Sequence, residues 1–136
     1  MLFDAYENSI STLSNEARKA YDLGVHRFLG AEPGVEIAFQ SAIDADEGFA
    51  LAHIGLAREM QLRGQPSRLR ASLNRALELA SNISVREQSH LHISALLLEG
   101  ESSAARTAVY EHVKNWPKDV LIAQMCTSVF GLIGFS

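Results

Sequence analysis

The 136-residue chain contains one cysteine, three prolines and no excess of basic residues. The single cysteine, Cys126, excludes a disulfide within these residues and a zinc site built from several cysteines. Twelve basic residues against 16 acidic ones give a net charge of −4. That balance argues against a nucleic-acid-binding protein that relies on a broad basic surface. We therefore expect no nucleic-acid partner.

Long hydrophobic runs and strand-like patterns are also missing. A bilayer-spanning helix needs roughly 20 apolar residues, and the most apolar run, 120–134, is shorter and mixed. The first residues are acidic and lack the basic region of a secretory signal. Alternating runs of Val, Ile, Tyr and Thr are absent, which predicts almost no sheet. From these absences we expect a cytoplasmic, all-α protein with no membrane partner.

What the sequence has is helical periodicity interrupted by turn residues. Hydrophobic residues make up 47% and charged residues 21%, as in a single globular domain. After an irregular arm over 1–13, Ser14 is a candidate N-cap, and Ser84 with Glu87 has the capping-box spacing. Breaks that contain Gly or Pro separate most of the helices. The spacing predicts seven helices, over about 14–29, 34–45, 49–63, 68–81, 84–99, 103–115 and 118–133.

The helices form a repeat of about 34 residues. Phe39 and Leu73 are 34 apart, as are Ala42 and Ala76. In the third unit, 36 residues further on, His112 stands where the other two have alanine. Small residues at this position allow two helices to approach closely. We therefore predict one domain over 1–136, a right-handed α-solenoid of antiparallel helix pairs. Its repeats cover 14–47, 48–82 and 83–117, and 118–136 forms an unpaired half-repeat.

This helix-pair pattern resembles the tetratricopeptide repeat. Three stretches resemble more specifically the N-terminal part of the tetratricopeptide repeat protein 38 family. They are SNEA at 14–17 with YDLGV at 21–25, FALAH at 49–53, and REQSH at 86–90 with WPKD at 116–119. The resemblance spans nearly the whole chain, and members of that family continue with further helices. It implies a helical-repeat protein that is not an enzyme.

The resemblance also implies a surface for a protein or peptide partner. In such arrays the first helix of each pair lines a concave binding face. Relatives that clamp a C-terminal carboxylate use Lys and Asn there, whereas this chain has Tyr21, Val25, Ile54 and Arg58, so that specificity is not expected. By the repeat positions, the binding residues would be Arg18, Tyr21, Ile54, Arg58, Gln61, Glu87, His90 and Leu97.

Catalytic and metal-binding patterns are weak. Glu87 and His90 form a Glu-x-x-His pair on one helix face, but a di-iron bundle needs a second such pair and two more glutamates. Ser89 beside His90 lacks the strand–turn–helix elbow of a hydrolase nucleophile. No phosphate-binding glycine loop is present. We expect no catalytic residues, no cofactor and no metal.

The densest charge feature is a group of arginines around the second repeat. We interpret it as a solvated face interleaved with Glu59 and Glu78, and its alternative is a patch for an acidic partner segment. The five arginines are Arg58, Arg63, Arg68, Arg70 and Arg75.

The sequence therefore favours a non-enzymatic scaffold for protein–protein interaction. The alternative is a helical module of a larger enzyme or metal-binding protein whose chemistry lies beyond Ser136. The last predicted helix is apolar on more than one side and has no partner helix. Two outcomes would cover it: self-association through this helix, as a homodimer or a weak aggregate, or docking of a following segment. We expect the first. The expected self-association residues are Leu121, Met125, Phe130 and Leu132.

Overall fold

The computed structural model describes residues 1–126, and its architecture is helical. The seven expected helices are present in this range, so the all-α class is confirmed. A short N-terminal strand pair, β1 (Leu2–Phe3) and β2 (Ser9–Ile10), precedes them. The helices are α1 (Asn15–Leu29), α2 (Val35–Ala45), α3 (Ala50–Leu62), α4 (Pro66–Glu78), α5 (Val85–Leu98), α6 (Ser102–Asn115) and α7 (Val120–Ala123), with 3-10 turns η1 (Ala80–Asn82) and η2 (Gln124–Cys126).

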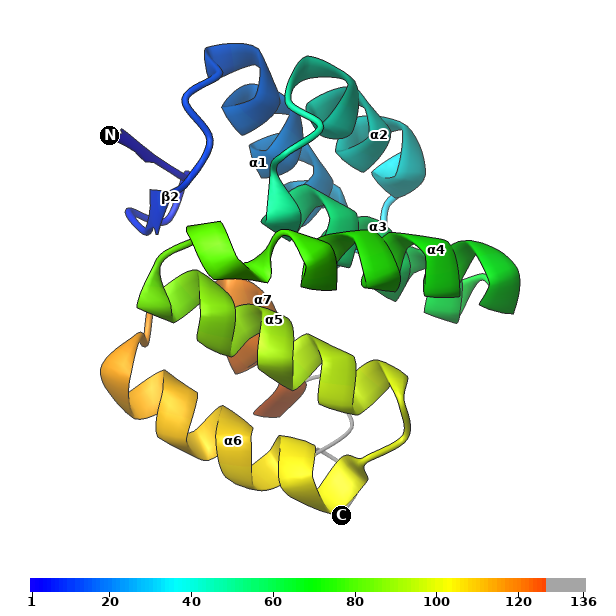
Figure 1. The fold of residues 1–136 in the computed structure, drawn as a ribbon, viewed down its shortest axis with the longest axis vertical. Helices are drawn as coiled ribbons and strands as arrows, with labels where there is room; N and C mark the ends of the chain where they lie inside the picture. The colour runs from blue at the N-terminus through cyan, green and yellow to red at the C-terminus, as the bar shows by residue number, and fades with distance from the viewer. Residues whose placement is uncertain (127–136) are drawn as a thin grey trace.

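Consecutive helices pack as pairs. α1 packs on α2, α3 on α4, and α5 on α6. Figure 1 shows the three pairs following one another along the long axis of the molecule, with the strand pair beside α1 and α7 behind α5. α3 also contacts α1, α2 and α5, so it is the helix that joins the first pair to the third. None of the described helices is both long and apolar enough to span a bilayer.

The predicted helix starts are confirmed by their hydrogen bonds. The Ser14 hydroxyl accepts the backbone N–H of Ala17 over 3.1 Å. Ser84 and Glu87 form a reciprocal capping box at the start of α5. These bonds satisfy N–H groups that have no partner within the helix. α6 ends at Asn115, shortly before Pro117, because the residue before a proline avoids the helical region.

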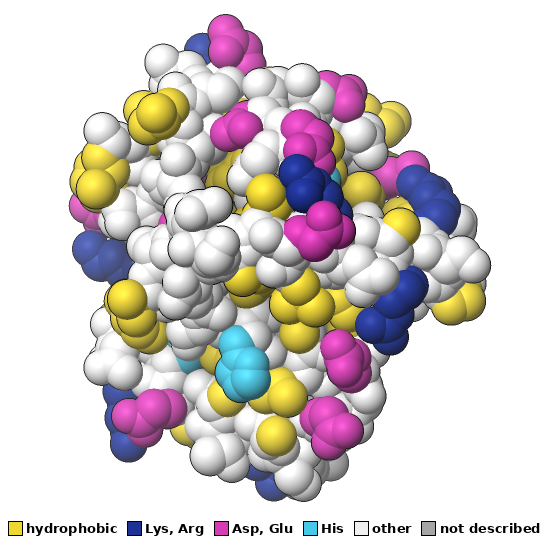
Figure 2. Space-filling model, in the orientation of Figure 1, with side chains coloured by type: hydrophobic (Ala, Val, Ile, Leu, Met, Phe, Trp, Pro, Cys, Tyr) yellow, Lys and Arg dark blue, Asp and Glu magenta, His cyan; other side chains and the backbone are white. Residues whose placement is uncertain are grey.

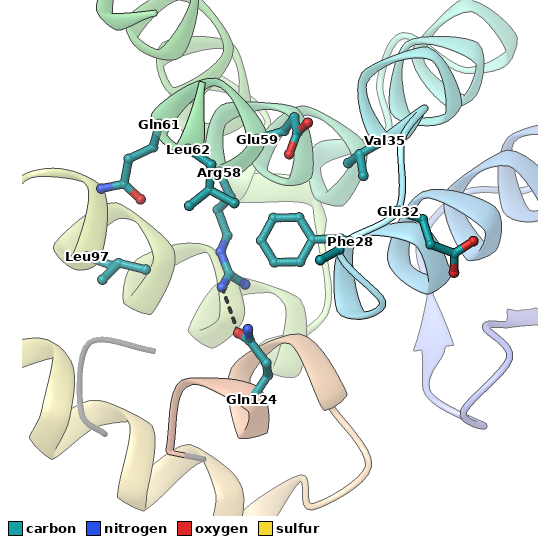
Figure 3. Close-up of a pocket in the computed structure, with 10 residues that line it drawn as sticks. Phe28, Glu32, Val35, Arg58, Glu59, Gln61, Leu62, Leu97 and Gln124 are labelled. Carbon is teal, nitrogen blue, oxygen red and sulfur yellow. Dashed lines mark hydrogen bonds between the residues drawn. The ribbon is translucent and has the colours of Figure 1, made fainter. Parts of the chain in front are cut away.

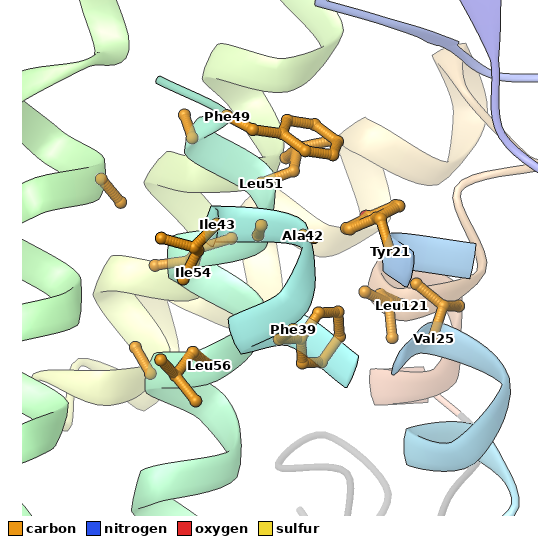
Figure 4. Close-up of a cluster of buried hydrophobic side chains, with 14 of the residues drawn as sticks. Tyr21, Val25, Phe39, Ala42, Ile43, Phe49, Leu51, Ile54, Leu56 and Leu121 are labelled. Atoms are coloured by element: carbon orange, nitrogen blue, oxygen red, sulfur yellow. The ribbon is translucent and has the colours of Figure 1, made fainter. Parts of the chain in front are cut away.

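Phe39 of α2 is a fully buried member of the main core (Figure 4). Its ring packs against two glycines, Gly24 on α1 and Gly55 on α3, where an added Cβ would lie 2.7 Å from ring atoms. Tyr21 completes the aromatic cluster, with its ring centroid 5.9 Å from that of Phe39. Ala76 is completely buried, as the repeat spacing predicts. Small residues thus set how closely these helices approach.

The N-terminal arm is not irregular: it forms a short strand pair, which is the little strand that the expectation of almost no sheet allowed. Leu2 pairs with Ile10 in an antiparallel two-stranded ladder. The Asp4 carboxylate accepts the backbone N–H groups of Tyr6 and Asn8, each over 2.9 Å, and so stabilises the turn. Strands of two residues are too short to show an alternating pattern, which is why the sequence did not reveal them.

The last predicted helix also differs from expectation. Within the described residues, α7 covers four residues and is followed by η2 rather than by more α-helix. Leu121 and Met125 are buried inside the chain, so they are not available as a self-association surface. Phe130 and Leu132 lie outside the described residues.

Candidate functional site

A cavity of about 470 Å³ lies where α1, α2, α3, α5 and η2 meet (Figure 3). Its apolar wall is formed by Phe28, Val35, Leu62 and Leu97. Its polar lining residues are Glu32, Arg58, Glu59, Gln61 and Gln124. Binding pockets for small ligands and side chains commonly combine an apolar wall with a few placed polar groups. The cavity is therefore the candidate binding site.

Arg58 is the central polar group of this cavity. It is only 5% exposed, although it lies on α3 among lining residues. Its Nη1 donates to the Leu121 carbonyl over 3.1 Å, and its Nη2 donates to Gln124 Oε1 over 3.3 Å. The guanidinium also lies 4.8 Å from the centre of the Phe28 ring, a cation–π contact. Contacts from α1, α7 and η2 thus hold this side chain in place.

The charge of Arg58 has no direct counter-ion within residues 1–126. Burial lowers the pKa of Arg58 to about 10, so the side chain stays protonated at neutral pH. Its hydrogen bonds go to a carbonyl and an amide, and no ion pair of the described residues includes it. A buried cation next to a cavity is an electrostatic feature that an anionic ligand group would satisfy.

Glu59, the next residue on α3, gives the cavity a second charge. Burial raises the pKa of Glu59 above its ordinary value. No side-chain hydrogen bond or ion pair of Glu59 exists among the described residues. A second hollow of about 350 Å³ shares Val35 and Glu59 with the first and extends past Ile37 and Arg63. We call the two hollows together the α3 groove.

The eight residues expected to bind a partner do not lie on one surface. Arg58, Gln61 and Leu97 line the cavity together. Arg18 pairs with Asp22 over 3.6 Å. The remaining four are buried in the interior, where a partner does not reach them: Tyr21, Ile54, Glu87 and His90.

Of the five clustered arginines, four lie near glutamates on the surface and one is buried. Arg63 and Arg68 both bind Glu36, and Arg75 binds Glu47. Arg70 lies 3.9 Å from Glu99. Lys and Arg side chains are scattered among acidic ones on the face shown in Figure 2. Arg58 is buried, so the interpretation of the five arginines as a solvated face is wrong for this residue.

A separate buried polar network joins the third helix pair to α7. The Asp119 carboxylate accepts bonds of 2.9 Å from Arg86 Nη1, His90 Nδ1 and His112 Nε2. Arg86 Nη2 also donates to the Ser9 carbonyl of β2 over 2.8 Å. Burial alone would raise the pKa of Asp119, but His90, His112 and Arg86 together hold it well below its ordinary range. Asp119 is therefore ionised at neutral pH and links four elements.

This network contains a serine, a histidine and an aspartate in the order used by serine hydrolases. Ser89 Oγ lies 2.7 Å from His112 Nδ1, and the opposite ring nitrogen bonds Asp119. However, Ser89 lies within α5, where backbone N–H groups are used by the helix and cannot form an oxyanion hole. Neither hollow of the α3 groove is lined by Ser89. The geometry supports a structural role, which is to hold α5, α6 and α7 together.

Glu87 and His90, which the sequence offered as a possible metal pair, form hydrogen bonds with different residues. The Glu87 carboxylate bonds the Ser11 backbone N–H and the Ser84 hydroxyl, while His90 bonds Asp119. Among residues 1–126 no group of three or more His, Cys, Asp and Glu is arranged to hold a metal ion. The sequence did not predict the His112–Asp119 contact. Its one signal was the histidine at the position of Ala42 and Ala76.

No family model, no curated protein and no solved structure matches this chain. The resemblance to tetratricopeptide repeats therefore stays a prediction from the sequence pattern.

Proposed function

We propose that this chain is a non-enzymatic helical-repeat module that binds a peptide segment of another protein in the α3 groove. The observation that carries the proposal is the meeting of Arg58, Gln61 and Leu97 at one cavity. The sequence pattern placed these three residues on the inner face of two successive repeats. In this proposal the helix pairs form a right-handed solenoid whose concave side is the groove.

The form of the groove supports a peptide as the ligand. Two hollows of about 470 and 350 Å³ share Val35 and Glu59, so together they have room for more than one side chain of a peptide. Leu62 at its edge is 60% exposed, and Ile37 of the second hollow is also exposed. Exposed large apolar side chains beside buried polar groups are typical of surfaces that contact another protein.

The test is selection from a library of random peptides displayed on phage, using the immobilised 136-residue chain. A selected peptide is then synthesised, and its Kd is measured by fluorescence polarisation for the wild type and for two variants. Leu62→Ser removes apolar contact in the groove and should weaken binding about tenfold, since burial of one leucine side chain is worth ~1.5–3 kcal/mol. Leu77→Ser, at an exposed leucine of α4 outside the groove, is the matched control.

Two results would contradict the proposal. One is a library from which no peptide binds saturably. The other is equal loss of affinity in Leu62→Ser and Leu77→Ser, which would place the binding surface elsewhere.

A further inference from the structure

We infer that the peptide bound in the α3 groove carries one acidic side chain, whose carboxylate pairs with the guanidinium of Arg58. This inference rests on the proposed function and adds the chemistry of the ligand. The motivating observation is a buried cation that lines a cavity and lies in no ion pair of the described residues.

Among residues 1–126, the bonds of Arg58 use only part of its donor capacity. A guanidinium carries five N–H groups in a planar fork. Two bonds to protein acceptors are present, to the Leu121 carbonyl and the Gln124 side chain. Figure 3 shows the guanidinium lying between Phe28 and Gln124. These contacts fix the fork before a ligand arrives, so little conformational entropy is lost when a carboxylate binds.

The burial of Arg58 favours a side chain over a chain terminus as the source of the carboxylate. The guanidinium is nearly inaccessible, and Phe28 covers one of its faces. A group that reaches it has to be narrow. A glutamate side chain places its carboxylate several bonds away from the peptide backbone, so the backbone can stay in the open groove.

The acidic residues of the groove favour a peptide with one acidic side chain over a peptide with several. Glu32 and Glu59 line the same cavity as Arg58. A run of acidic residues would bring like charges together there, which is unfavourable in a partly buried site. An acidic residue with apolar neighbours satisfies Arg58 and covers Phe28, Val35 and Leu97 without this repulsion.

The probes are three pools of octapeptides that are acetylated and amidated, so that neither terminus is charged. A central residue is fixed as Glu, Gln or Lys, and the other positions are random mixtures of Ala, Leu, Ser and Val. We expect the Glu pool to bind the 136-residue chain at least about tenfold more tightly than the Gln pool, because a charge-assisted bond is about twice as strong as a neutral one. A fourth pool has central Gln and a free C-terminal carboxylate.

Three variants test whether Arg58 causes the preference for Glu over Gln peptides. Arg58→Lys keeps a charge and a donor for the Leu121 carbonyl but loses the fork, so the preference for Glu over Gln should fall several-fold. Gln61→Glu adds a negative charge at an exposed lining residue, where folding is not at risk, and should weaken the Glu pool and not the Gln pool. Asn74→Asp adds the same charge on α4, which lines neither hollow, and should change neither.

The outcomes separate the inference from the proposed function. Equal affinities for the Glu and Gln pools, both sensitive to Leu62→Ser, would overturn the inference and leave the binding module standing. Binding of the fourth pool alone would overturn the side-chain assignment. If a peptide competes with concentration-dependent self-association of the chain, a second copy is the occupant, and the inference is wrong. No binding by any pool or library peptide would overturn both.

Discussion

His90 Nδ1 lies 2.9 Å from the Asp119 carboxylate, and this bond ties the middle of α5 to the residue that precedes α7. Arg86 and His112 bind the same carboxylate. One ionised side chain therefore connects the strand pair, the third helix pair and α7. Because Asp119 and its three partners are all buried, the network is sensitive to the loss of any one member.

Replacing Asp119 by alanine should destabilise the chain by about 3–5 kcal/mol. The variant leaves Arg86 buried without its counter-ion, and it leaves two histidines without an acceptor. Urea denaturation followed by circular dichroism measures the change. Glu111→Ala removes an exposed carboxylate from α6 and should cost less than about 1 kcal/mol. A loss of similar size in both variants would show that the network contributes little.

The same network predicts a pH dependence on the acid side. The pKa of Asp119 in the folded chain lies well below its ordinary value of 3.8. Its stabilisation is therefore complete above about pH 5 and is lost as the pH falls from there toward the folded pKa, because the unfolded chain takes up the proton first. In Asp119→Asn the fall in unfolding free energy between pH 5 and pH 3 should be smaller. Identical slopes in wild type and variant would contradict the assignment.

Gly55→Ala tests the close contact with Phe39. An added Cβ would lie 2.7 Å from the Phe39 ring, so the core has to shift, at a cost of about 1–3 kcal/mol. This cost should exceed the gain of roughly 1 kcal/mol from replacing glycine inside a helix. The double variant with Phe39→Leu should recover part of the loss. Gly48→Ala, where the nearest atom is 3.4 Å away, is the control, and an equal melting temperature for both single variants would refute the packing argument.

Ala76→Leu tests the small-residue position of the repeat. Ala76 is fully buried between helices, so three added carbons should overpack the site and cost about 1–3 kcal/mol. Ala71→Leu makes the same change at an exposed position of the same helix and should be nearly neutral. The midpoint of thermal unfolding distinguishes them. No loss in Ala76→Leu would mean that this position does not set the helix spacing.

The features that the sequence predicted are those carried by local pattern. Ser84 with Glu87 follows from spacing within one helix, and Ala42 with Ala76 from the spacing of successive repeats; they gave the helix starts and the close helix contacts. The N-terminal strand pair was missed because the carboxylate of Asp4, rather than a run of strand formers, stabilises it.

The features that the sequence missed depend on contacts between distant segments. Asp119 meets His90 and Arg86 across about thirty residues, and no local pattern marks such a pair. The sequence pattern grouped Arg58 with four surface arginines, but its side chain is buried, where it contacts the Leu121 carbonyl and the Phe28 ring. Four of the expected binding residues are buried, since repeat position fixes the helix face but not which other segments of the chain cover it.

The most direct test of the proposed binding module is a nuclear magnetic resonance titration of the isotope-labelled chain with a library-selected peptide. If the peptide binds in the α3 groove, the amide signals of Phe28, Arg58, Gln61 and Leu97 should shift saturably together. Signals of Ala71 and Asn74 on the exposed side of α4 should stay in place. Saturable shifts confined to residues outside the α3 groove, or no shifts at all, would contradict the account.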